Sequence, residues 1–574
     1  MRSETPLAVG RLMMTSGKRL APVLLAVMLL AVRANALATE NLDVIWSIPD
    51  SSLEGFGTSL ASGDVNGDGV PDLVVAWDTF DSNGGMTPLR GIVNIYYGDH
   101  IGETIPDVVL RSPVWKGANA PFLACGDLNG DGYADVVMGE DMADQGAGIC
   151  TVWFGGNPMD TIPDVIIHGR TVWWLNSHFG YDVSMGDVNG DGYEDLAVGA
   201  YSSAERPAEF GTGRVYVFYG GPGFDTLPDV TLRGGHDGDY EGFGSGVSAA
   251  GDFDHDGFND LYIGAWQYGS DSRGRMYVYY GGNPMDTSYD MAMSGEGAGH
   301  FLGYEKPGAL HAQGNFDYAV EGNELWPHGS YDPGNNCGKV YIHQGGRSMD
   351  SIPDISIIGR MDSANLGYSA QSAGDVTGDG NDDLVAGAPY SWPPSATGAA
   401  YLWETGSHFD TVPDAWMMGD AAQQVVGERV CTAGDLNGDG RSEFMVSNYS
   451  CNPQQHVWVC NYTGSGVQEE EVVGVRSGPA LRVYPSPCRD RVQVNCPLVA
   501  GKNSTLSVFD VAGRVVRTLA LPQGRSNEPS RAVSWDLRDN AGRRVSQGVY
   551  IVELQQYTGS VASCSWAKVI VQGQ

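Results

Sequence analysis

A nine-residue acidic motif occurs six times along the 574 residues of the chain, and it restricts the possible folds more than any other feature. The first copy reads Asp64-Val-Asn66-Gly-Asp68-Gly-Val70-Pro-Asp72, and the others occupy residues 127–135, 187–195, 252–260, 375–383 and 435–443. Each copy has oxygen-bearing side chains at positions 1, 3, 5 and 9, and a glycine at position 6 permits a sharp turn. Oxygen ligands gathered in this way are typical of calcium loops.

An EF-hand is the familiar alternative, but it needs a bidentate glutamate at position 12 and a helix on either side. Position 12 is apolar in all six copies, as at Val75 and Ile263, and it lies in a short run that is typical of a buried strand. A paired-loop dockerin also fits poorly, because its loops lead into helices and lie closer together. The motif is therefore predicted to join two strands.

The copies start about sixty residues apart, except for one interval of about twice that length between residues 252 and 375. Halfway along this interval, residues 314–323 keep the flanking apolar residues but have lost the centre of the loop. We therefore predict seven structural repeats and six intact metal loops, with no metal in the fifth repeat.

Further signals recur around each loop. A Phe-Gly pair or a weaker form of it precedes most loops, as at Phe56-Gly57, and a hairpin with a turn such as Asp225–Asp229 follows. Four short strands in a unit of about sixty residues are typical of a propeller blade. Residues 43–49 look like a last blade strand without a blade, and we expect them to complete the seventh repeat and close the ring.

These motifs resemble the FG-GAP repeat family, found in the propeller heads of integrin α chains and in bacterial surface proteins, over residues 43–465. The resemblance implies an all-β, seven-bladed propeller with calcium between the first two strands of several blades, bound by the side chains at positions 1, 3, 5 and 9 and the carbonyl at position 7. The implied ligands are Asp64, Asn66, Asp68, Val70 and Asp72; Asp127, Asn129, Asp131, Tyr133 and Asp135; Asp187, Asn189, Asp191, Tyr193 and Asp195; Asp252, Asp254, Asp256, Phe258 and Asp260; Asp375, Thr377, Asp379, Asn381 and Asp383; and Asp435, Asn437, Asp439, Arg441 and Glu443.

Residues 1–38 have the features of a secretory signal peptide. Lys18 and Arg19 precede an apolar stretch at residues 20–32 that is too short to span a bilayer, and small residues ending at Ala36 and Ala38 offer cleavage sites. The propeller is expected over residues 39–466, followed by a linker over residues 467–477. We find no other segment apolar enough to span a membrane and expect an exported chain.

A small Ig-like β-sandwich is expected over residues 478–574, where seven short strands alternate with turns. Its Tyr484-Pro-Ser-Pro run, Gly548-Val-Tyr segment and terminal Lys568-Val-Ile-Val segment resemble the FlgD-like and type IX sorting domains of bacterial secreted proteins. The resemblance implies delivery to the cell surface by a secretion machinery.

The net charge of −37 argues against nucleic acid or an anionic membrane as a partner. The nine cysteines do not form a disulfide framework, because their number is odd and their spacing irregular. Two disulfide bridges are possible: one within the set Cys431, Cys451 and Cys460, and one within the set Cys488, Cys496 and Cys564.

Aromatic residues just past the predicted second strands are candidates for ligand recognition, because flat rings can stack on sugars or anchor a protein. They are Trp77, Tyr201, Trp266, Tyr390 and Trp392. Packing between blades is the alternative role for the same rings.

The sequence contains no Gly-x-Ser-x-Gly, His-Glu-x-x-His or phosphate-binding motif, and His255, in the fourth loop, is expected to point to solvent. We predict a monomeric, secreted or cell-surface propeller that binds about six calcium ions, mainly for structure, and acts as a binding or adhesion module for an extracellular protein or glycan. The alternative is an extracellular polysaccharide-active hydrolase or lyase that uses the propeller axis, since such a site needs no linear motif.

Overall fold

The computed structural model describes the chain over residues 37–50, 55–77, 91–114, 121–170, 176–204, 211–234, 240–304, 308–310, 318–323, 338–346, 349–359, 365–390, 397–406, 409–419, 424–450, 454–464, 482–484, 491–497, 503–510, 515–519, 530–546, 548–558 and 561–571. Two compact units, Met1–Gly466 and Val467–Gln574, make up the chain. The described part contains no helix with the length and apolar character needed to cross a membrane.

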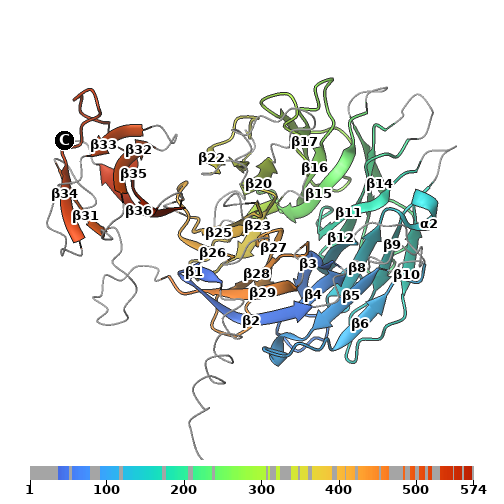
Figure 1. Cartoon of the computed structure of the whole chain (residues 1–574). Helices are drawn as coiled ribbons and strands as arrows, with labels where there is room; N and C mark the ends of the chain where they lie inside the picture. The colour runs from blue at the N-terminus through green and yellow to red at the C-terminus, as the bar shows by residue number, and fades with distance from the viewer. Residues whose placement is uncertain are drawn as a thin grey trace, which may run out of the picture. The chain divides into compact units, whose positions relative to one another are not determined.

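The described residues of the first unit form seven antiparallel sheets, one for each predicted repeat, which confirms the propeller (Figure 1). Their strands are β3 (Phe56–Gly63), β4 (Asp72–Trp77), β5 (Ile92–Tyr96) and β6 (Val108–Arg111); β7 (Phe122–Gly126), β8 (Asp135–Glu140), β9 (Ile149–Trp153) and β10 (Val165–His168); β11 (Phe179–Gly186), β12 (Asp195–Ala200), β13 (Arg214–Phe218) and β14 (Val230–Arg233); β15 (Phe243–Gly251), β16 (Asp260–Ala265), β17 (Arg275–Tyr279) and β18 (Met291–Ser294); β19 (Gly308–Leu310), β20 (Tyr318–Asn323), β21 (Lys339–Gln344) and β22 (Ile355–Ile358); β23 (Ser369–Gly374), β24 (Asp383–Ala388), β25 (Ala399–Trp403) and β26 (Ala415–Met418); and β27 (Arg429–Gly434), β28 (Glu443–Ser447), β29 (Gln455–Tyr462) and β2 (Leu42–Asp50). Two short helical turns, η1 (Gly98–His100) and α2 (Ala143–Gly146), lie in the first two repeats.

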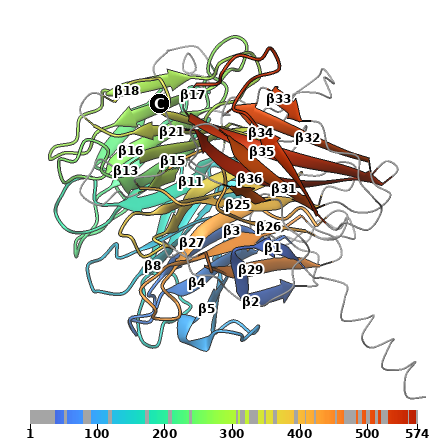
Figure 2. The same ribbon diagram turned by 90° about the vertical axis from the view of Figure 1, so that its left-hand side faces the viewer.

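The ring closes through the first long strand of the chain. β2 pairs antiparallel with β29, with Leu42 opposite Tyr462 and Asp50 opposite Gln455. Figures 1 and 2 both show β2 in blue beside β29 in orange. The first strand of each repeat contacts that of the next, and β27 returns to β3. The N-terminal strand therefore supplies the fourth strand of the seventh blade, where the sequence placed it.

A second N-terminal strand, which the sequence did not reveal, extends the sixth blade. β1 (Ala38–Glu40) pairs with β26, with Ala38 opposite Met418. Leu37 packs against the apolar cluster between the sixth and seventh blades. Leu37 and Ala38 fall at the end of the predicted signal peptide, but in the structure they form part of the propeller.

The blades are held together by buried apolar clusters, one at each of the seven blade interfaces. Alternate side chains of a strand point to opposite faces of its sheet, so each blade contributes to two clusters. On β4, Val74 joins the cluster shared with the second blade, whereas Leu73 and Val75 join the cluster shared with the seventh. Cys460 lies buried at one such interface as a free thiol, and Cys451 lies outside the described residues.

In the described residues of the second unit, the predicted seven strands form two sheets. One sheet contains β30 (Arg482–Tyr484), β31 (Val492–Pro497) and β34 (Ser530–Trp535), and the other contains β33 (Val515–Leu519), β32 (Asn503–Asp510), β35 (Gly548–Thr558) and β36 (Val561–Val571). Side chains from both sheets form a single apolar core around the fully buried Trp535. The unit is an all-β domain with its own core.

Candidate metal loops and axial pocket

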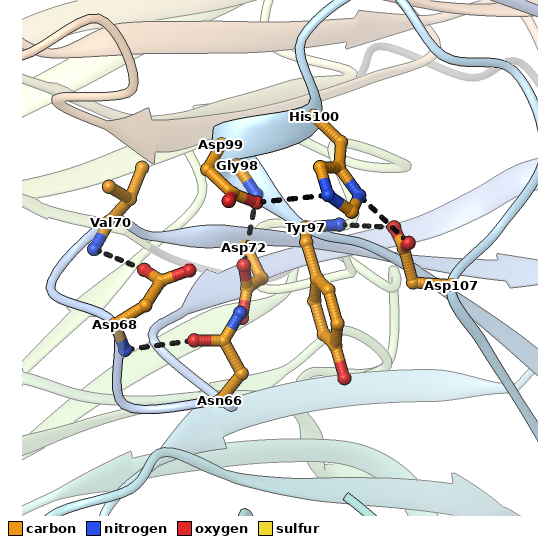
Figure 3. A network of polar contacts seen from close by, with 9 residues as sticks. All are labelled: Asn66, Asp68, Val70, Asp72, Tyr97, Gly98, Asp99, His100 and Asp107. Carbon is orange, nitrogen blue, oxygen red and sulfur yellow. Dashed lines mark hydrogen bonds and ion pairs between the residues drawn. The ribbon is translucent and has the colours of Figure 1, made fainter. Parts of the chain in front are cut away.

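The acidic loops fold around their own carboxylates, as Figure 3 shows in part for the first loop. The Asp64 carboxylate accepts hydrogen bonds from the main-chain N–H groups of Gly67, Asp68 and Gly69, at 2.7, 3.0 and 2.8 Å. Asn66 accepts one from Asp68 at 2.8 Å. Gly67 and Gly69 have φ values of 71° and 90°, in the left-handed region that favours glycine. Alternating Asp, Asn and Gly residues therefore produce a tight loop between the first two strands of the blade.

The carboxylate at position 9 is buried and connects the loop to the following hairpin. Asp72 accepts hydrogen bonds from the N–H of Val65, inside the loop, at 3.0 Å and from the N–H of Gly98, after β5, at 2.9 Å. Asp135, Asp195, Asp260 and Asp383 make equivalent pairs of bonds in their own repeats. Glu443 accepts from the N–H of Leu436 in the same way. Position 9 therefore fixes where β4 and its counterparts begin.

Burial has an electrostatic cost at these positions. Desolvation raises the pKa of Asp72 to about 7, the main-chain hydrogen bonds from Gly98 and Val65 oppose this rise, and the nearby carboxylates of Asp68 and Asp64 add to it. The same causes raise the pKa values of Asp135, Asp195, Asp383 and Glu443 to about 7 and that of Asp260 to about 8. Carboxylates that lie this close together disfavour each other's ionisation. A divalent cation bound among them would stabilise their charged forms.

The donor set fits a hard cation. Every side-chain donor at positions 1, 3, 5 and 9 is an oxygen, the ligand type that Ca²⁺ prefers. In the fourth loop, ligand atoms of Asp252, Asp254 and Asp260 lie within 4.8 Å of one another. Asp64 accepts three hydrogen bonds, and a carboxylate offers about four acceptor positions, so it can still coordinate an ion. A bound ion would be held by these oxygens and would supply charge neutralisation and a rigid turn.

Neighbouring loops are joined by main-chain hydrogen bonds across the blade interfaces. The N–H at position 8 of one loop donates to the carbonyl at position 1 of the preceding loop, as from Ala134 to Asp64 at 2.9 Å. Glu194, Asn259 and Ser442 make the equivalent bonds to Asp127, Asp187 and Asp375. The ring of Tyr133, at position 7, covers Gly67 so closely that a Cβ atom there would lie 2.4 Å from it. These bonds therefore link the acidic loops of blades one to four, and those of blades six and seven, from one blade to the next.

The predicted loop positions are all among the described residues except those of the fifth repeat. His255 is exposed, as predicted, with a φ of 59° at position 4 of the fourth loop. Residues 311–317, which contain the centre of the degenerate fifth loop, lie outside the described residues.

A cavity of about 210 Å³ opens on the propeller axis, lined mainly by the first strands of six blades. Its lining is Ser59, Leu60, Phe122, Leu123, Tyr181, Asp182, Ser245, Tyr304, Tyr368, Ser369, Gln371, Arg429, Val430 and Tyr449. We call it the axial pocket. Tyr181, Tyr304 and Tyr368 each directly follow a Phe-Gly or Leu-Gly pair, so equivalent positions of different repeats meet here.

Three of the aromatic residues singled out in the sequence pack behind the axial pocket. Tyr201 contacts Tyr181 with ring centroids 4.6 Å apart, Trp266 contacts Tyr304 at 5.2 Å, and Tyr390 contacts Tyr368 at 6.1 Å. Trp77 instead packs at the interface of the seventh and first blades, and Trp392 lies outside the described residues. The residues that line the pocket itself were missed.

The pocket lining contains one positively and one negatively charged side chain. The Arg429 guanidinium lies 5.4 Å from the ring centroids of both Tyr368 and Tyr449, and its Nε donates to the carbonyl of Thr58 at 3.1 Å. The Asp182 carboxylate accepts from the N–H groups of Val183 and Val247, at 2.9 and 2.8 Å. Both charges are therefore held in fixed positions.

Comparison with known families agrees with both halves of this architecture. The FG-GAP repeat matches residues 179–218, 243–279 and 366–403, and an FG-GAP-like repeat matches residues 64–138. A secretion system C-terminal sorting domain matches residues 482–572. The chain thus contains FG-GAP repeats and a type IX sorting domain, as the motifs indicated, and it is a secreted or cell-surface protein. The FlgD-like similarity stays a prediction.

Among individual proteins, integrin alpha-5 of Xenopus laevis is 32% identical over 162 residues, which are 28% of this chain and 15% of that protein. Integrin alpha-7 of Rattus norvegicus is 36% identical over 27% of this chain and 13% of its own length. The chain therefore matches only a small part of these relatives. PorZ, a surface component of the type IX secretion system of Porphyromonas gingivalis, aligns over 90% of this chain and 81% of its own at 12% identity, with a TM-score of 0.29.

Proposed function

We propose that this protein is a calcium-stabilised propeller that binds an extracellular ligand, as an adhesion or recognition module, and reaches the cell surface by means of its C-terminal domain. Six calcium ions would occupy the six intact loops, held by the residues assigned above. Their role would be structural, because each set of ligands belongs to one turn between two strands and is linked to neighbouring turns.

The lining of the axial pocket carries the binding assignment. Phe122 and the four tyrosines of the lining surround it, and three serines add hydroxyl groups to those of the tyrosines. Recognition sites combine aromatic surface with a few fixed polar groups in this way. Arg429 and Asp182 are held by main-chain groups, which suits a rigid site that orients a ligand.

An enzyme at the axis, such as a hydrolase or lyase, is less well supported. Such chemistry commonly uses a pair of carboxyl groups on either side of the reacting bond. Within the described lining of the axial pocket, Asp182 is the one carboxyl group, and both of its oxygens accept main-chain hydrogen bonds. The integrin alpha chains named above share FG-GAP repeats with this chain, and this similarity also favours a binding role.

A glycan array tests the proposal. The calcium-loaded full chain, fluorescently labelled, should bind a restricted set of immobilised glycans, and binding should be lost when the protein is stripped of calcium. Release of new reducing ends or unsaturated sugars from a bound polysaccharide would favour the enzyme instead. Absence of binding to every glycan, and to an equivalent array of extracellular proteins, would contradict the binding function.

The role of the C-terminal domain has its own test. A chain that ends at Gly466 retains β2 and β29 and all seven blades, so it should fold and keep its calcium. In the native host it should remain in the periplasm, whereas the full chain is found at the surface. Normal surface display of the shortened chain, measured by protease accessibility on intact cells, would contradict the assignment.

A further inference from the structure

We propose that the axial pocket binds a single carboxylated sugar ring, such as a terminal uronic acid of a surface glycan, with the carboxylate placed on Arg429. This inference rests on the binding function proposed above and specifies its ligand. Three properties of the pocket lead to it: its size, its aromatic and hydroxyl lining, and the position of its positive charge.

The size of the pocket limits the ligand to one small ring. Its volume of about 210 Å³ is below the roughly 300–1,000 Å³ of pockets for drug-sized ligands. The remainder of a longer glycan would have to lie outside the pocket. A terminal residue of a chain is therefore the natural occupant.

The lining offers both kinds of contact that a sugar ring needs. Tyr181, Tyr304 and Tyr368 supply aromatic surface from three different blades, and Phe122 packs 5.2 Å from Tyr181. A pyranose has an apolar face of C–H groups that packs against such rings, while its rim carries hydroxyl groups. Packing on aromatic surface and hydrogen bonding at the edges are therefore both possible in the same pocket.

Serine hydroxyls lie among these rings. Ser59 Oγ accepts a hydrogen bond from the N–H of Leu123 at 3.1 Å, and Ser369 Oγ accepts one from the N–H of Val430 at 3.2 Å. Ser245 Oγ donates to the carbonyl of Gly303 at 2.7 Å. A hydroxyl group has one donor and two acceptor positions, so each of these bonds leaves capacity for sugar hydroxyls.

Arg429 determines the charge of the ligand. Its guanidinium is oriented by hydrogen bonds from Nε to the carbonyl of Thr58 and from one terminal nitrogen to the carbonyl of Glu428 at 2.9 Å, and it lies 5.4 Å from the ring centroids of Tyr368 and Tyr449. A planar guanidinium with fixed orientation suits a carboxylate. Both oxygens of Asp182 already accept main-chain hydrogen bonds, so a ligand carboxylate is directed to the guanidinium of Arg429.

An acidic peptide side chain could also reach Arg429, but it would use neither the tyrosine side chains that line the pocket nor the serine hydroxyls. The pocket lining therefore favours the sugar. The two occupants make different predictions, and one titration experiment separates them.

The experiment measures binding to the calcium-loaded full chain by isothermal titration calorimetry. The probes are a trisaccharide that ends in glucuronic acid, the same trisaccharide ending in glucose, and a glutamate-rich hexapeptide. We expect the acidic trisaccharide to bind at least roughly tenfold more tightly than either of the others, because the neutral trisaccharide makes no charge-assisted hydrogen bond to Arg429 and the peptide does not use the tyrosine rings and serine hydroxyls. Equal binding of the two trisaccharides, tighter binding of the peptide, or no binding of the acidic trisaccharide would overturn the proposal.

Two variants test the site itself. Arg429→Gln should weaken binding of the acidic trisaccharide roughly ten- to a hundredfold and leave the neutral one unchanged. Tyr304→Ala, at a rim residue with 39% of its surface exposed, should weaken binding of the acidic trisaccharide while preserving the fold. Tyr289→Ala is the matched control, because Tyr289 is similarly exposed but does not line the pocket. Melting temperature and calcium content verify the fold of each variant.

The outcomes distinguish this inference from the broader proposal. If the array detects glycan ligands whose binding is unchanged by Arg429→Gln and Tyr304→Ala, the binding function stands and the axial pocket is the wrong site. If the array detects none and the acidic trisaccharide does not bind, both are wrong.

Discussion

The acidic loops of the first four blades and those of the last two differ in how they are connected. Loops one to four form a continuous run, in which each later loop donates a main-chain hydrogen bond to the one before it. Loops six and seven form a separate pair through the bond from Ser442 to Asp375. At the seam between loops seven and one, position 8 is Pro71, which has no N–H to donate. The same motif thus occurs in a run of four and in a pair.

If calcium occupies the loops as proposed, this difference implies that the ions would not act independently. An ion bound in one loop would order the turn that contains the position-1 carbonyl, and that carbonyl accepts the bond from the next loop. Sites within a run should therefore stabilise one another, whereas the run and the pair should respond separately. Four predictions test this comparison, from the largest expected effect to the smallest.

Removal of calcium should affect both groups of loops and have the largest effect. Nineteen of the residues at ligand positions are acidic, so the calcium-free propeller contains strong local repulsion, and each bound ion adds stability by mass action. We expect the melting temperature in excess EGTA to fall by on the order of 10 °C or more. EGTA that is already saturated with calcium is the control. An unchanged melt, together with no calcium in elemental analysis, would exclude the metal assignment.

Single-ligand variants should separate the run from the pair. Asp187 lies in the third loop, with linked loops on both sides, whereas Asp375 lies in a loop linked only to the seventh. At saturating calcium each alanine variant should lose one ion, measured by elemental analysis. At limiting calcium Asp187→Ala should lose more ions than Asp375→Ala, because its neighbours are weakened as well. Asp317→Ala, in the degenerate fifth loop, should lose none, and equal losses from all three variants would contradict the linkage.

The stability of the calcium-free protein should depend on pH through the position-9 carboxyls. Their folded-state pKa values of about 7 to 8 lie above the unfolded value near 4. Such groups add stability that is complete below the unfolded pKa and is lost as the pH rises through the folded pKa. Protein stripped of calcium should therefore melt at a higher temperature at pH 5.5 than at pH 8.

A control for this pH effect is Asp260→Asn, which removes the titrating group with the highest of these pKa values at nearly constant shape. This variant should show a smaller difference between the two pH values. A difference as large as that of the original protein would assign the pH dependence to groups outside the loops.

A substitution that links the run of loops one to four to the pair of loops six and seven should have the smallest effect. Pro71→Ala supplies the N–H that is missing at the seam, so it permits a bond to the carbonyl of Asp435. The gain of one hydrogen bond and the loss of proline rigidity oppose each other, so stability should change by no more than about 1 kcal/mol. Calcium titration should nevertheless become more cooperative. An unchanged titration curve would mean that the bond does not couple the loops.

The acidic loops could be predicted from the sequence and the axial pocket could not, and the reason lies in how each is assembled. All five proposed donors of a loop lie within nine residues, so one short motif contains the whole candidate site. The axial pocket instead takes one to three residues from each of the seven blades, far apart along the chain. Tyr181, Tyr304 and Tyr368 each directly follow a Phe-Gly or Leu-Gly pair. This recurrence is a usable signal, because equivalent positions of different blades meet at the propeller axis.

Two other features show the limits of local patterns. β1 has only three residues, so no periodicity could reveal it, and its pairing with β26 depends on the position of β2. Trp77 is the last residue of β4 and lies opposite Phe56, as Ala200 lies opposite Phe179, whereas Tyr201 follows the end of β12. This difference of one position places Trp77 in the apolar cluster between the seventh and first blades, because alternate residues of a strand point to opposite faces.

The pairing of β2 with β29 has a consequence for the order of events during folding. The first long strand to be synthesised finds its partner only after roughly four hundred further residues have been made. Contacts this distant in sequence form slowly and late. The seventh blade therefore cannot be completed during synthesis of the earlier blades, and an incompletely exported chain would retain two open sheet edges that invite aggregation. The ring can therefore close only when both ends of the propeller sequence, β2 and β29, are present in the same compartment.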